Sequence, residues 1–121
     1  MPLRGLGRHL VVEMYECDGV LDGEEVMNYL EEAAKVSNAK VVKSFLHKFN
    51  PHGISAVVVI EESHLAVHTW PEYRFVALDV FTCGDETDPW RAYDYLRSKF
   101  KPKRVSVMEI TRGILEESAN I

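Results

Sequence analysis

The chain has 121 residues, which is enough for one compact domain and too few for two. Hydrophobic residues make up 46% of the chain, a share typical of soluble globular proteins that bury a core. Its formal net charge of −5 excludes the strongly basic surface of a protein that binds nucleic acid through its phosphates.

The sequence carries only weak signals for export from the cell or for insertion into a membrane. The apolar stretch after the first arginines is interrupted by Glu13 and Glu16, so it does not resemble a secretory signal. Residues 54–60, the longest strongly apolar run, are too few to cross a bilayer as a helix. We therefore expect a cytoplasmic protein without a membrane partner, in which Cys17 and Cys83 stay reduced.

The first predicted elements are a strand and a helix. Residues 9–17 alternate between two faces, which indicates a strand. Asp22 and Glu25 have the spacing of a capping box, in which two side chains satisfy free backbone amides at a helix start. Apolar residues then repeat at helical spacing, which predicts an amphipathic helix that ends near Asn38.

The middle of the chain is dominated by strands. Four are predicted, at residues 40–49, 54–60, 64–70 and 75–82. Asn50-Pro51-His52-Gly53 forms a turn between the first two, and Pro71 ends the third. Such short connections favour hairpins, so we expect neighbouring strands to pair antiparallel.

A second helix and a last strand complete the pattern. Asp88 followed by Pro89 supplies a cap and a first-turn proline for a helix that Pro102 ends. Residues 105–110 form the last predicted strand, and the tail from Gly113 is expected to fray.

The order β-α-β-β-β-β-α-β predicts a single α+β domain over residues 1–121. It should be a two-layer sandwich, a mostly antiparallel sheet with two helices on one face. The other face of such a sheet is left uncovered. Phe75, Phe81 and Val57 are expected to lie on it, and a homodimer would bury it.

The segment from Glu61 to Tyr73 concentrates reactive side chains. His68, Trp70 and Glu72 share parity, so they should project from one face. Ser63 has the opposite parity to His68 and would not meet it within one regular strand. We therefore expect Ser63 at a bend or at a chain end.

This segment is part of a larger set of motifs, which runs from about Gly7 to Arg112. The set comprises Gly7-Arg8-His9-Leu10, Tyr15-Glu16-Cys17, the 49–60 hairpin, Glu62-Ser63-His64-Leu65, His68-Thr69-Trp70-Pro71-Glu72 and Phe81-Thr82-Cys83-Gly84. It resembles the small prokaryotic S-adenosylmethionine decarboxylases, which are self-processing, pyruvoyl-dependent enzymes of polyamine (spermidine) biosynthesis. The resemblance implies that the precursor cleaves itself between Glu62 and Ser63, into fragments 1–62 and 63–121.

The chemistry that the family implies explains why a serine is needed there. Its hydroxyl attacks the preceding carbonyl to form an ester, a base removes the α-proton, and β-elimination breaks the ester. The resulting dehydroalanine tautomerises and hydrolyses to a pyruvoyl group, which forms a Schiff base with the substrate amine and accepts electrons as carbon dioxide leaves. The implied cofactor is thus derived from Ser63, and no metal is expected.

The resemblance also implies roles for other residues. His68 corresponds to the base that removes the α-proton, and Ser55 to its hydroxyl partner. Cys83 corresponds to the acid that reprotonates the substrate carbon. Phe49 is implied as the adenine-stacking residue and Glu72 as the acceptor for the ribose hydroxyls. Trp70 shares parity with His68 and is therefore predicted to form a further wall of the substrate pocket. In the family, this site is assembled across a homodimer interface.

The sequence departs from the family pattern at two places near this site. Arg74 stands where glycine is common, and His52 stands at a turn position where tyrosine is expected.

Several other interpretations of these residues remain. The same scaffold could decarboxylate arginine or ornithine, or serve as a catalytically silent binding subunit. His64 and His68 have the spacing of a helical zinc pair, although the alternation indicates a strand. Taken singly, each of these residues is more often a core or surface residue than a catalytic one.

Overall fold

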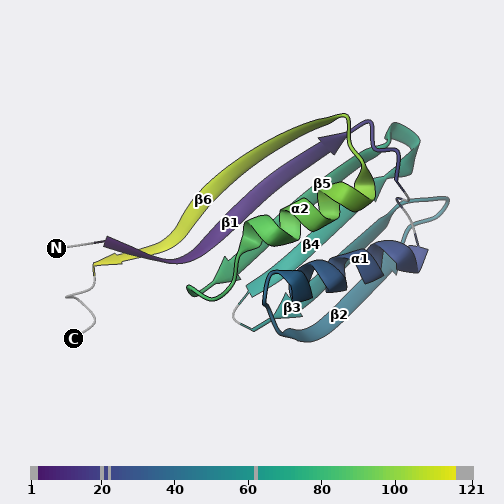
Figure 1. The fold of residues 1–121 in the computed structure, drawn as a ribbon. Coiled ribbons are helices and arrows are strands. Elements are labelled where there is room, and N and C mark those ends of the chain that lie inside the picture. The colour runs from purple at the N-terminus through teal and green to yellow at the C-terminus, as the bar shows by residue number, and fades with distance from the viewer. Residues whose placement is uncertain (1–2, 20, 22, 62, 117–121) are drawn as a thin grey trace.

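The computed structural model describes residues 3–19, 21, 23–61 and 63–116, and in them it shows an antiparallel sheet with two helices packed on one face (Figure 1). In chain order the elements are β1 (Leu3–Tyr15), α1 (Gly23–Val36), β2 (Val41–Lys48), β3 (Ile54–Ile60), β4 (Ser63–Trp70), the 3₁₀ helix η1 (Pro71–Tyr73), β5 (Phe75–Cys83), α2 (Pro89–Phe100) and β6 (Arg104–Glu116). The predicted two-layer α+β fold is confirmed.

The described part of the sheet has six strands in the order β2-β3-β4-β5-β1-β6. The hairpins β2–β3, β3–β4 and β4–β5 follow the chain, as the short turns predicted. The first strand is then inserted between β5 and β6, and pairs antiparallel with both. The first and last strands therefore lie side by side in the sheet (Figure 1).

The helices begin and end largely where the local signals placed them. Asp88 caps α2 by accepting a hydrogen bond from the Trp90 backbone amide at 3.0 Å, and Pro89 occupies the first turn. In α1 the buried residues recur at helical spacing. Asp22, half of the predicted capping box, lies outside the described residues.

Two predicted boundaries were wrong, both in the pair β1–β6. The first strand begins at Leu3 rather than at residue 9, and the last strand continues to Glu116. Gly113, where fraying was expected, lies inside this strand, and the next residue, Ile114, pairs with Gly5. Each end supplies the other's hydrogen-bond partners, a long-range pairing that local sequence does not reveal.

The core lies between the helices and one face of the sheet. Leu10, Leu30, Leu65, Leu96 and Phe100 are fully buried there. The alternate residues of each strand point to the opposite face, which no described element covers.

The uncovered side of the sheet is here called the open face. Phe75, Phe81 and Val57 lie on it, as predicted, and each is only partly buried. Phe45 and Met108 are 52% and 61% exposed on the same face. Among the described residues, no helix is long and apolar enough to span a bilayer.

Candidate functional site

A serine and a histidine on the open face, both singled out from the sequence, form a short polar contact. Ser55 of β3 and His68 of β4 are directly paired across the two strands. The Ser55 Oγ lies 2.7 Å from His68 Nδ1. When Nδ1 donates this hydrogen bond, the Nε2 lone pair is free to accept a proton. The pair therefore has the geometry of an oriented general base.

A pocket of about 380 Å³ opens beside this pair. It is lined by Phe49, His52, Gly53, Ile54, Ser55, His68, Thr69, Trp70 and Glu72. The residues Phe49 and Trp70 are 51% and 40% exposed, so their side chains are available to a ligand. The tertiary structure thus brings together five of the eight residues singled out from the sequence: Phe49, Ser55, His68, Trp70 and Glu72.

The acid of this pocket is carried by η1, just beyond the end of β4. The short helix closes at Arg74, whose backbone is left-handed (φ 51°) and whose amide donates to the Pro71 carbonyl at 3.1 Å. The Arg74 guanidinium bonds Asp18 at 2.8 Å and does not line the pocket. Arginine therefore occupies a conformation that favours glycine, while its charge is paired with Asp18 instead of facing the ligand.

Another part of the pocket lining comes from the turn between β2 and β3. Gly53 has a φ of +96°, and a Cβ there would lie 2.9 Å from the Thr69 carbonyl oxygen. The turn can therefore press against β4 only with glycine at this position. Buried Thr69 also accepts a hydrogen bond from the Ile54 amide at 3.0 Å. These contacts hold Phe49, at the start of the turn, beside the pocket.

Two histidines of this region were not singled out from the sequence as site residues. His47 is the cross-strand neighbour of Ser55, and its ring packs on Phe49 with centroids 4.6 Å apart. His52 lies 3.3 Å from Glu72. For His47 the sequence held a signal, because its two-residue spacing from Phe49 puts both side chains on one face of a strand. For His52 it held none, because only the folded turn brings this residue to Glu72.

Ser63 and Cys83 lie at the other end of the sheet. Ser63 is the first residue of β4 and pairs with Ile60 of β3. Its Oγ is buried without a hydrogen-bond partner among the described residues. Because His64 pairs with Phe81, Cys83 ends β5 near the start of β4. Glu62, the other half of the predicted cleavage site, lies outside the described residues.

Within the chain these two ends of β4 do not meet. Ser63 and His68 are five residues apart in β4, which corresponds to roughly 16 Å along an extended strand. Their side chains also project from opposite faces, since Ser63 shares parity with the buried Leu65 and Val67. The sequence prediction that they would not meet in a regular strand is confirmed.

A third group of titratable residues lies between the two ends on the open face. The His9 Nε2 lies 2.9 Å from Asp79 Oδ1, and Arg112 approaches the other ring nitrogen at 3.5 Å. Burial lowers the pKa of His64, and the neighbouring His9 lowers it further.

His64 and His68 belong to a strand, where the spacing i, i+4 separates them by roughly 13 Å. This distance is too large for the two residues to share a zinc ion.

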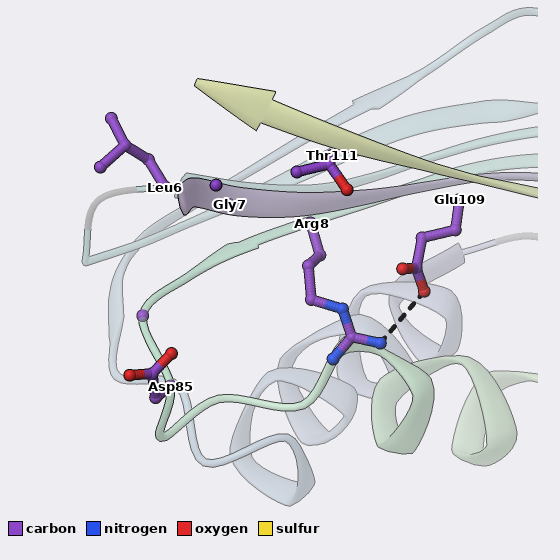
Figure 2. A pocket seen from close by; sticks show the side chains of 8 residues that line it. Leu6, Gly7, Arg8, Asp85, Glu109 and Thr111 are labelled. Carbon is purple, nitrogen blue, oxygen red and sulfur yellow. Dashed lines mark hydrogen bonds and ion pairs between the residues drawn. The ribbon is translucent and has the colours of Figure 1, made fainter. Parts of the chain in front are cut away.

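Another hollow, of about 430 Å³, lies next to Cys83, because Gly84 and the Cys83 partner Gly7 line it (Figure 2). Its lining includes Gly7, Asp85 and Thr111, and Arg8 reaches across it to Glu109 at 3.0 Å. Trp90 donates to the same carboxylate at 2.6 Å. The ion pair engages Arg8 and Glu109 with one another, and none of the candidate residues itself lines the hollow.

Comparisons with known proteins agree with the motif set. The family model of S-adenosylmethionine decarboxylase matches residues 8–113. The S-adenosylmethionine decarboxylase proenzyme of Thermotoga maritima is 50% identical over 117 residues, covering 95% of this chain and 90% of the relative. That of Acetivibrio thermocellus is 44% identical and covers 98% of both chains. The crystal structure of the adenosylmethionine decarboxylase from Aquifex aeolicus has a TM-score of 0.88 at 37% identity, covering 94% of this chain and 96% of that one.

Proposed function

The chain belongs to the S-adenosylmethionine decarboxylase family, and we infer that it is a proenzyme whose pyruvoyl-dependent product decarboxylates S-adenosylmethionine for polyamine synthesis. The Ser55–His68 pair in the floor of an aromatic and acidic pocket is the observation in the structure that most directly supports this. Phe49 and Trp70 supply stacking surfaces for an adenine, and Glu72 supplies an acceptor for ribose hydroxyls.

Self-processing is proposed at the bond between residues 62 and 63. The Ser63 Oγ is buried and has no hydrogen-bond partner in the described part of the chain, which leaves its lone pairs available to attack the preceding carbonyl. Cleavage releases Ser63 from the alternation of β4, so the new terminus can turn toward the open face. These features fit a serine that is converted to a pyruvoyl group, which supplies an electron sink once formed.

The catalytic residues are proposed to meet across a dimer of open faces. A two-fold axis near Ala66, at the middle of β4, would place the Ser63 end of one copy over the Ser55–His68 end of the other. The separation of roughly 16 Å within one protomer is then the spacing between two equivalent sites. The exposed apolar residues Phe45 and Met108 would be buried by the same contact.

The remaining roles follow from position. His68, oriented by Ser55, would remove the α-proton of Ser63 during self-cleavage. Cys83 ends β5 next to the start of β4, close enough to the reacting terminus to return a proton to the substrate carbon.

The test is an intact mass spectrum followed by an activity assay. The purified wild type should separate, under denaturing conditions, into fragments 1–62 and 63–121, the second with a blocked terminus. Carboxyl-labelled S-adenosylmethionine should then release labelled carbon dioxide, while labelled arginine and ornithine should not. The variant Ser63→Ala should remain a single inactive chain. A wild type that stays intact, or that releases carbon dioxide only from arginine or ornithine, would refute this function.

A further inference from the structure

A histidine from the β2–β3 turn contacts the acid of the substrate pocket. The His52 Nε2 lies 3.3 Å from Glu72 Oε2, and both side chains line the pocket beside Phe49 and Trp70. The two side chains are 44% and 39% exposed, so both remain accessible to a ligand from solvent. His52 and Glu72 are twenty residues apart in the chain, and the fold brings them together.

Both partners are held by well-fixed backbone. The turn that carries His52 is closed by a hydrogen bond from the Phe49 amide to the Gly53 carbonyl at 2.8 Å. Gly53 packs directly on β4, as described above. On the other side, η1 is pinned by the hydrogen bond from the Cys17 amide to the Arg74 carbonyl at 3.0 Å. The contact is thus made between two anchored segments.

The contact engages one oxygen of the carboxylate. A glutamate side chain has several free torsions, which must be ordered when it binds a ligand. With Oε2 engaged by His52, the other oxygen, Oε1, is directed by the same contact and left to accept from a ligand. Among the described residues that line this pocket, His52 and His68 are the basic ones, and His68 is already engaged by Ser55.

We propose that His52 is a positioning residue for ribose recognition, which fixes Glu72 so that its carboxylate meets the diol of the substrate. This inference rests on the proposed function, because it takes Glu72 as the acceptor for the ribose hydroxyls. The position of Glu72 that His52 fixes favours the bound substrate and the transition state equally. His52 therefore contributes to binding rather than to the rate of decarboxylation.

The test compares two variants of His52 in the processed enzyme. His52→Ala should raise KM for S-adenosylmethionine about tenfold, with kcat within about twofold of the wild type. It should also reduce discrimination against the 2′-deoxyribose analogue of the substrate. His52→Gln, whose amide can still donate to Glu72, should retain most of the affinity and the discrimination. Equal losses in the two variants would contradict a role that depends on a donor.

A matched control and a double variant separate positioning from a general effect on structure. Lys48→Ala removes a contact of 3.9 Å with Glu24 from the same hairpin and should leave KM unchanged. With Glu72→Gln already present, His52→Ala should cause no further loss of discrimination. An additive loss in the double variant would overturn the proposal.

The proposed function and this inference fail in different ways. Self-cleavage of His52→Ala should proceed at the wild-type rate, because His52 contacts Glu72 rather than the Ser55–His68 pair that acts in self-cleavage. If the wild type neither cleaves nor decarboxylates S-adenosylmethionine, the proposed function is wrong. If the wild type does both while His52→Ala keeps its KM and its discrimination, only the positioning role is refuted. Thermal unfolding of each variant identifies a folding defect. If His52→Ala has such a defect, His52→Gln and the double variant decide whether His52 positions Glu72.

Discussion

If Ser63 of one protomer reacts with His68 of its partner, two inactive variants should complement each other. Ser63→Ala retains the base and lacks the nucleophile, whereas His68→Ala retains the nucleophile and lacks the base. In a mixed dimer, one of the two sites combines the intact Ser63 with the intact His68. The His68→Ala chain should be cleaved there, although neither variant is processed efficiently alone.

The magnitude follows from the geometry and the symmetry. A base must approach its proton within about 3 Å, directly or through one water, whereas the two residues of one protomer are roughly 16 Å apart and on opposite faces. Random pairing of equal amounts places about half of the His68→Ala chains in mixed dimers, so about half of them should be cleaved before purification and nearly all of them in the isolated mixed dimers. A site within one protomer predicts no rescue at all.

The assay is co-expression of the two variants with different tags. Tandem purification isolates the mixed dimers, and denaturing mass spectrometry counts cleaved and intact chains of each variant. Each variant expressed alone serves as the control. Mixed dimers in which the His68→Ala chain stays as intact as in the control would refute the arrangement across the interface.

Three further expectations follow from the site and the surrounding charges. Cys83→Ala should cleave normally, because the thiol acts after processing, but its kcat should fall by about 10²- to 10⁴-fold; unchanged turnover would exclude the thiol as the proton donor. Burial raises the pKa of Cys17 to about 11, so this thiol should resist iodoacetamide near about pH 8 until the protein unfolds, as peptide mapping with and without denaturant can check. Hydrogen bonds from Arg8 and Trp90 lower the pKa of Glu109, so its contribution to stability is present above its ordinary pKa of 4.5 and is lost as the pH falls through the lowered value. The difference in Tm between wild type and Glu109→Gln should therefore shrink on acidification, and a constant difference would argue against the linkage.

The sequence by itself determined the elements, their order and their faces. Apolar residues at helical spacing and the Asp88-Pro89 cap located the helices, and alternation assigned the buried and open sides of the strands. The motif set identified the family, which the comparisons confirm. Parity alone also predicted that Ser63 and His68 do not meet within β4. These features are local, because they depend on residues within a few positions of one another.

Only the tertiary structure decided which residues of different elements lie opposite one another. Alternation says that Ser55 and His68 share a face, but the length of the β3–β4 turn sets the register that puts them 2.7 Å apart. The pairing of β1 with β6 extended both strands beyond the predicted ends, because each supplies hydrogen-bond partners from the far end of the chain. The contact of His52 with Glu72 likewise needs two turns to be folded at once. Such pairings are long-range, and a local pattern carries no information about them.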